Sequence, residues 1–168
     1  MRIFAWYRSM FKVILLFTIT VLGLIACILR PGHAGFVEVE KALPQDKSHV
    51  FNSFTVDEQL DIYLYAQLGL IEGGDPEYVQ YLAVNGESKI HAVGNRIDLE
   101  KDFHTKLMLV RALDIIDGRC LCVGKNLDVL DTIRRNRLEK SSADPEDQLI
   151  LKDLYAKYLD DIELRANK

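Results

Sequence analysis

The chain has 168 residues, with 21 basic and 25 acidic side chains that are unevenly distributed along it. Residues 1–30 contain four basic residues and no acid, so the rest carries 17 basic and 25 acidic residues, a net charge of −8. An acidic body of this kind repels phosphate backbones, and we therefore expect no nucleic-acid partner. The sequence contains no low-complexity tract and no long block of like charge, so we expect the body to fold.

An uncharged apolar run lies near the start of the chain, at residues 13–29. An α-helix of this length spans about 25 Å, close to the roughly 30 Å hydrocarbon core of a bilayer. Most nearby basic residues precede the run, which places the N-terminus in the cytoplasm. The sequence predicts four parts: a basic cytoplasmic region (1–12), a transmembrane anchor or signal segment (13–29), a linker (30–54) and a helical extracytoplasmic domain (55–168).

Three interpretations of this start remain open. An uncleaved anchor fits the length of the run and predicts a single-pass protein of the inner membrane with its body in the periplasm. Cleavage near Ala34 would release a secreted periplasmic protein, because Gly32 and Ala34 provide small residues before the cut. The stretch "LIAC" resembles a bacterial lipobox, and this resemblance implies a lipoprotein with its lipid on Cys27.

The body contains signals for helices and no convincing pair of strands. Thr55 and Glu58 have the spacing of a capping box, and Asp75-Pro76 has the pattern of a helix start. The stretch "FVEVEK" alternates apolar and acidic residues, but it has no partner strand, so we expect an extended linker there. The sequence predicts an all-α domain of about six antiparallel helices, which begin at or near Thr55, Asp75, Glu87, Asp98, Leu127 and Asp144.

Apolar side chains recur at three- and four-residue spacing along these helices and predict the core. The expected buried residues are Leu60, Tyr63, Leu64, Leu68, Ile71, Tyr78, Val79, Leu82, Ile90, Val93, Ile97, Phe103, Leu107, Val110, Leu113, Ile116, Leu127, Leu130, Ile133, Leu138, Leu149, Leu154, Tyr155, Tyr158 and Ile162.

The stretch "TVDEQLDIYLYAQLGLIEGGDPEYVQYLAVNGESKIHAVGNRI", residues 55–97, resembles the paired-helix units of HEAT- or armadillo-like solenoids. The resemblance implies a short α-solenoid that presents a surface to a partner and contains no catalytic centre. The sequence has no clean internal period, so a compact irregular bundle is the alternative.

The segment "GRCLCVGKN", residues 118–126, contains the only two cysteines of the body, Cys120 and Cys122. It does not fit a phosphate-binding loop, because its spacing is one residue too long and Asn126 replaces the required Ser or Thr. Tetrahedral zinc would need two more ligands from scattered histidines, and we expect no metal and no cofactor. Two small buried side chains are the favoured interpretation, and a disulfide, local or between chains, is the alternative.

Two further groups could form a partner surface. Tyr65 and Tyr81 are expected to remain exposed, because only some of the tyrosines in their helices can face the core. Arg134, Arg135 and Arg137 form the only basic cluster of the body, which is either a solvated face or a contact for an acidic partner or anionic lipid.

No arrangement of Ser, His, Cys and acidic residues is typical of a catalytic site, so we expect a protein that is not an enzyme. A hydrolase with dispersed carboxylates is the enzymatic alternative. We expect a membrane-tethered periplasmic domain that binds another envelope protein as an accessory to an assembly. The second possibility is a periplasmic immunity or inhibitor protein that neutralises a basic toxin or enzyme.

Overall fold

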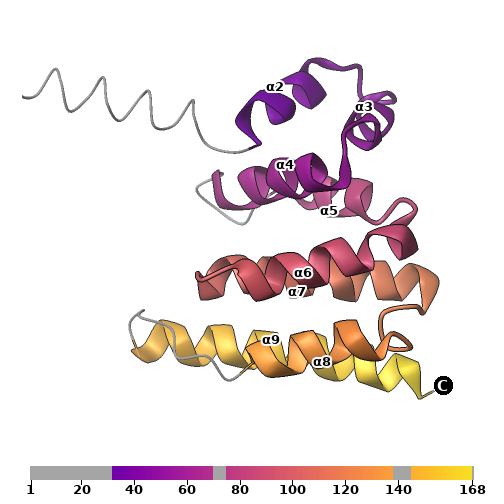
Figure 1. The fold of residues 1–168 in the computed structure, drawn as a ribbon. Helices are drawn as coiled ribbons and strands as arrows, with labels where there is room; N and C mark the ends of the chain where they lie inside the picture. Colours follow the sequence, from indigo (N-terminus) through magenta and orange to yellow (C-terminus); the bar gives the residue numbers. More distant parts are fainter. Residues whose placement is uncertain (1–31, 70–74, 138–144, 168) are drawn as a thin grey trace, which may run out of the picture.

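The computed structural model describes residues 32–69, 75–137 and 145–167, and in these ranges every regular element is helical (Figure 1). The all-α class is therefore confirmed for this part of the chain. The predicted membrane segment at 13–29 and Cys27 lie outside the described residues. The elements are α2 (His33–Lys41), α3 (Lys47–Ser53), α4 (Val56–Gly69), α5 (Pro76–Leu82), the 3₁₀-helix η1 (Gly86–Lys89), α6 (Ile90–Leu99), α7 (Phe103–Cys120), α8 (Leu127–Asn136) and α9 (Pro145–Ala166).

Within the described ranges, no helix combines the length and the apolar character needed to cross a bilayer.

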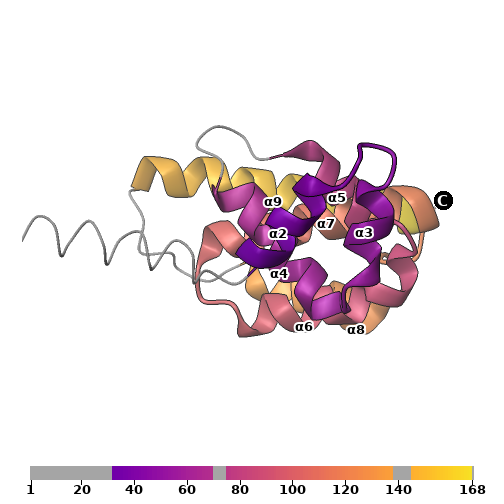
Figure 2. The same ribbon diagram turned by 90° about the horizontal axis from the view of Figure 1, so that it is seen from above.

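The helices are stacked in pairs, and each pair lies on the next (Figure 1). The pairs are α2 with α3, α4 with α5, α6 with α7, and α8 with α9. The first helices of successive pairs contact one another, from α2 to α4, α6 and α8, and so do the second helices, from α3 to α5, α7 and α9. Figure 2, which looks down on the stack, shows these helices superimposed along it.

Helices α7 and α9, which are neighbours in one layer of the stack, run in the same direction. The ring of Phe103, at the start of α7, stacks on Tyr155 in the first half of α9 at 5.6 Å between centroids. Near the other end, the side chain of Asp117 bonds that of Arg165. Helices α7 and α9 are therefore parallel. Helix α8, which lies between them in the sequence, runs in the opposite direction and packs on α6 in the other layer (Figure 1).

The predicted starts of two helices are confirmed. The Glu58 carboxylate accepts from the backbone N–H of Thr55 at 2.9 Å, and the Thr55 hydroxyl accepts from the backbone N–H of Glu58 at 3.4 Å. The Asp75 side chain accepts from the N–H of Glu77 at 2.9 Å, with Pro76 as the first helical residue. These local hydrogen bonds satisfy donors that a helix start leaves unpaired.

The predicted start of the fourth helix at Asp98 is wrong. Asp98 lies inside α6, which continues to Leu99, and the cap of α7 is Asp102, whose carboxylate accepts from the N–H of Thr105 at 2.7 Å. Both aspartates precede the same apolar pattern, and only Asp102 has the extended backbone that an N-cap requires.

The predicted linker at 30–54 is also wrong, because α2 and α3 fill this segment. The alternation that suggested an extended chain also places Phe36 and Val39 three residues apart, and on a helix they reach the same face. Val39 and Phe51 are fully buried in the common core. Gly32 begins α2 with a φ of 83°, and a side chain there would overlap the backbone carbonyl of Asp61 in α4. The described part of the domain thus begins at least twenty residues before the predicted boundary.

Most of the predicted core is confirmed, but Tyr158 is only partly buried and three leucines are exposed. Leu127, Leu149 and Leu154 are exposed. Leu127 is the first residue of α8, at one end of the stack, and the other two lie on α9, which has no further helix pair of the described chain to cover it. The side chains of Leu68, Ile71 and Leu138 lie outside the described set.

Candidate functional site

Tyr65 does not form part of an open surface. Its hydroxyl lies 2.8 Å from Nδ1 of His33, and its ring packs against Phe36 at 5.2 Å between centroids. Both contacts come from α2, the helix that replaces part of the predicted linker. The side chain is only partly exposed, so the expectation of an exposed Tyr65 is corrected.

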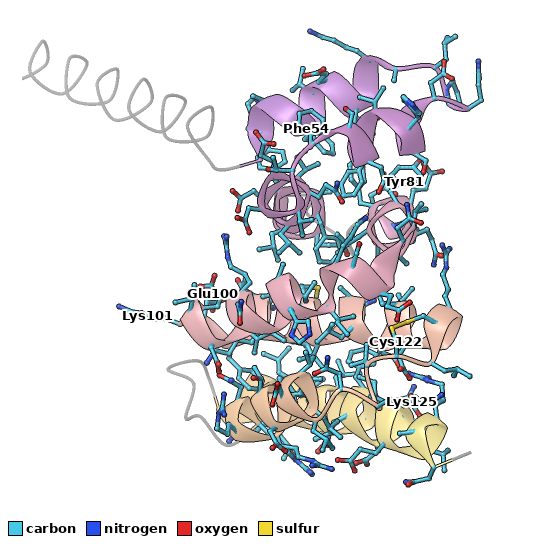
Figure 3. The ribbon with its side chains drawn as sticks, turned by 45° about the vertical axis from the view of Figure 1, so that its right-hand side comes forward. Phe54, Tyr81, Glu100, Lys101, Cys122 and Lys125 are labelled. Atoms are coloured by element: carbon cyan, nitrogen blue, oxygen red, sulfur yellow. A yellow bond between two sulfur atoms is a disulfide. The ribbon has the colours of Figure 1, made fainter. Side chains whose placement is uncertain are left out.

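Tyr81 is covered in the same way. Its ring packs on Phe51 of α3 and on Tyr78, and its hydroxyl donates to the carboxylate of Glu77 at 2.7 Å (Figure 3). Burial, followed by this hydrogen bond to a carboxylate, raises the pKa of Tyr81. The two tyrosines are therefore held by neighbours of the same chain. These contacts could not be predicted, because the sequence indicated a linker where α2 and α3 cover the tyrosines.

The three arginines are exposed as expected, and two of them already have acidic partners. Arg134 lies 2.8 Å from Glu163 of α9, and Arg135 lies 2.9 Å from Asp98 of α6. Arg137 makes no ion pair with a described residue. Since two of the three charges are compensated by nearby acids, this cluster attracts an anionic partner less than its sequence suggests.

Cys120 and Cys122 are joined by a disulfide, rather than being two separate buried thiols. Cys120 is the last residue of α7, and Leu121 follows with a φ of 52°, a left-handed conformation that turns the chain sharply. Both cysteines are partly exposed. Figure 3 shows Cys122 and Lys125 on the side of the stack opposite to Glu100 and Lys101. We call residues 121–126, which connect α7 to α8, the disulfide loop.

A buried carboxylate organises the disulfide loop. Asp117 is 1% exposed, and its Oδ1 accepts from the backbone N–H groups of Val123 at 2.9 Å and Gly124 at 3.2 Å. Its Oδ2 accepts from Nε of Arg165 at 2.8 Å, and Arg165 also bonds Asp114. One side chain thus ties the loop to the end of α9. Asp117 carries no sequence signal for this role, because its partners lie on another loop and another helix.

Two lysines are buried among the helices. Lys89 is 4% exposed, and its Nζ donates to Oδ1 of Asn52 at 2.8 Å and to the carbonyl of Leu82 at 3.0 Å. Burial lowers the pKa of Lys89 to about 8. The Nζ of Lys106 donates to Oδ1 of Asn136 at 2.7 Å. Each lysine connects helices that are distant in sequence. The burial of Lys89 has a sequence signal, because Lys89 stands four residues before the buried Val93 and therefore faces the same side of a helix.

No group of three or more His, Cys, Asp or Glu side chains in the described ranges is arranged to hold a metal ion. The buried ionisable groups described above instead bond asparagine side chains, an arginine or the backbone.

Large apolar side chains remain exposed along α9. Leu149 is 63% exposed, Ile150 is 61% exposed, and Leu154 and Leu164 are also open to solvent. Exposed aspartates, Asp153 among them, lie between these residues. We call Leu149, Ile150, Leu154 and Leu164 the outer face of α9.

The fold defines an all-α domain of stacked helix pairs, and a more particular assignment finds no support among known proteins. Searches against family models, curated proteins and solved structures gave no match to this chain.

Proposed function

We propose that the chain is a membrane-tethered, extracytoplasmic helical scaffold that binds another protein of the cell envelope and performs no catalysis. The observation that carries the proposal is the outer face of α9, four large apolar side chains left exposed on the last helix of the stack. Successive stacking of helix pairs is the arrangement of an α-solenoid, in which each helix pair contacts only its neighbours and the stack offers an extended surface.

The position of α9 explains why its outer face is open. The helix packs on α7 through Tyr155, Leu159 and Ile162, all of them buried. In a solenoid the terminal unit must be polar on its outer side or be covered by something else. Here Leu149 and Ile150 are more than half exposed, and exposed apolar groups bordered by polar residues are typical of protein–protein contacts.

The tether is supported by the sequence. The run at 13–29 lies outside the described residues, contains no charge and follows a basic segment. A tethered domain searches only the membrane surface, which raises its effective concentration toward envelope partners. The stack then places its surface within reach of proteins that share the membrane.

The non-catalytic part of the proposal is supported by how the buried ionisable groups are used. Asp117 holds two backbone N–H groups and Arg165, and Lys89 holds Asn52 and a backbone carbonyl. Such groups already have structural partners, so they do not converge on a place where a substrate could bind.

The test compares variants of the full-length chain extracted from membranes in mild detergent. Ile150→Asp should reduce recovery of the bound envelope protein at least tenfold, because a charge would be buried in the contact. Leu43→Asp is the matched control, because Leu43 is also 61% exposed but lies between α2 and α3. Equal recovery with both variants would contradict the proposed surface. Extraction without detergent, with Met1 and Cys27 unmodified, would contradict the tether.

The acidic surplus favours one second candidate, an inhibitor of a basic enzyme or toxin. The body carries 25 acidic and 17 basic residues after residue 30. A complex based on this charge forms quickly and weakens as salt rises, because screening shortens the range of the attraction. A Kd that rises more than tenfold between 50 and 500 mM salt would favour this candidate, and one that changes little would favour the apolar contact of the scaffold.

A further inference from the structure

We infer that Cys120 and Cys122 form a thiol–disulfide exchange site, which takes up two electrons from a dithiol and returns them to a disulfide. The inference goes beyond the proposed scaffold, because it concerns the C-terminal end of α7 and not the outer face of α9. It rests on three features of the disulfide loop: the bond is not needed to hold the loop, it is accessible, and a carbonyl acceptor is ready for one released thiol.

The bond contributes little to holding the fold together. The two cysteines lie two positions apart, with only Leu121 between them. A crosslink that closes so short a segment removes little conformational freedom from the unfolded chain. The loop is held in place by other contacts, since Asp117 binds the backbone N–H groups of Val123 and Gly124. The loop can therefore keep its shape when the bond is broken.

The bond is also accessible to a reagent. Both cysteines are partly exposed, and Leu121 between them is 47% exposed. The loop lies on one side of the stack, where Figure 3 shows Cys122 and Lys125. Exposed disulfides are the labile ones in proteins, whereas structural disulfides are protected from attack.

The chemistry requires a partner with two thiols. One partner thiolate attacks Sγ of Cys120, the electron pair of the bond passes to Cys122, and Cys122 leaves as a thiolate that takes a proton from water. The second partner thiolate then attacks the partner's sulfur in the mixed disulfide and releases Cys120, which also takes a proton. The partner dithiol is oxidised to a disulfide, and the pair is reduced to two thiols.

The structure assigns the two sulfurs different tasks. Sγ of Cys120 lies 3.3 Å from the carbonyl oxygen of Ile116 in the preceding turn of α7. Once released, Cys120 can donate its S–H to that oxygen, and the negative end of the helix dipole also favours the neutral thiol. Cys122 lies beyond the helix in the disulfide loop, so its thiolate is the better leaving group, and Cys120 is the sulfur that forms the mixed disulfide.

The first experiment equilibrates the full-length chain with buffers of reduced and oxidised glutathione and counts free thiols by maleimide mass shift, with peptide mapping to separate Cys27. We expect the pair to be reduced reversibly across these buffers and the urea midpoint to be the same in both forms. A bond that stays oxidised until the chain unfolds, or a chain that unfolds on reduction, would overturn the inference.

The second experiment tests the division of tasks. Cys120→Ser leaves only Cys122 of the pair, and Cys122→Ser leaves only Cys120. With oxidised glutathione, we expect the Cys120→Ser variant to form its mixed disulfide at least tenfold faster than the Cys122→Ser variant, because Cys122 is farther from the negative end of α7 and forms its thiolate more readily. Equal rates would overturn the assignment of Cys122 as the leaving sulfur. The double variant controls for folding, and its urea midpoint should match that of the parent, because the inference holds that the bond does not support the fold.

Discussion

The carboxylate of Asp117 lies 2.8 Å from Nε of Arg165, and this ion pair joins the last turns of α7 and α9. The same carboxylate accepts two backbone N–H groups of the disulfide loop, so three donors share one buried side chain. Asp117 therefore holds the disulfide loop, which connects α7 to α8, against the C-terminal end of α9.

Replacing Asp117 by Asn should lower the free energy of unfolding by about 2–4 kcal/mol, because Arg165 loses a partner in a largely buried place while one amide oxygen remains for the loop. Urea unfolding followed by circular dichroism measures the change. Asp131→Asn is the control, since its partner Arg134 is exposed and the pair is screened by water. Similar losses in the two variants would mean that the buried Asp117 pair contributes no more to stability than the exposed Asp131 pair.

Lys89 should make stability depend on pH above neutrality. Burial lowers the pKa of Lys89 to about 8, below the value of about 10.4 for an unfolded lysine. Between these values the unfolded chain binds more protons than the folded one, so the free energy of unfolding rises with pH, by up to about 3 kcal/mol in total. Below pH 8 the lysine is charged in both states and its contribution is constant.

The measurement compares the free energy of unfolding of the parent with that of Lys89→Met from pH 7 to pH 10. Subtracting one from the other cancels the contributions of the other titrating groups. The stability of the parent relative to the variant should increase across this range. Both hydrogen bonds, to Asn52 and to Leu82, can persist, because a neutral amine keeps two donors. A flat difference would show that the charge of Lys89 is solvated.

Local signals predicted the helix starts that depend on neighbours in sequence. Thr55 and Glu58, and likewise Asp75, cap their helices through bonds over two or three residues, and the sequence contains both partners. The core faces followed from three- and four-residue spacing for the same reason. Asp98 failed as a start because it has the same sequence signal as Asp102 but a different backbone.

Features that depend on distant contacts could not be predicted. Helices α2 and α3 have nine and seven residues, lengths at which an isolated helix is unstable in water. They form because Val39 and Phe51 reach a core built mainly by later segments. The exposure of Tyr65 and Tyr81 was misjudged as a consequence, since the helices that cover them were expected to be linker.

Phe51→Ala tests whether α3 belongs to the domain. Phe51 is fully buried and packs on Tyr78 and Tyr81, so the variant should lose about 3–5 kcal/mol of unfolding free energy. The exposed Leu43 provides the control, and Leu43→Ala should change stability by less than about 0.5 kcal/mol. If Phe51→Ala were as mild as the control, the segment would be the linker that its sequence suggests.

A last prediction concerns two glycines on either side of the disulfide. A side chain on Gly124 would lie 2.5 Å from Cβ of Ala166 and 2.9 Å from the carbonyl oxygen of Ile162, both on α9. Since backbone cannot move aside easily, Gly124→Ala should cost about 1–3 kcal/mol. Gly118 lies in α7 with no atom within 4 Å of an added Cβ, and Gly118→Ala should stabilise the chain by about 0.5–1 kcal/mol.

The two alanine variants add the same methyl group six residues apart, so their opposite signs in urea unfolding isolate the contact with α9. If both stabilised the chain, the end of α9 would not rest against the disulfide loop. The arrangement that Asp117 and Arg165 define would then be absent in solution. Opposite signs, together with an unchanged rate of glutathione exchange in Gly118→Ala, would place the tight packing at Gly124 and leave the disulfide open.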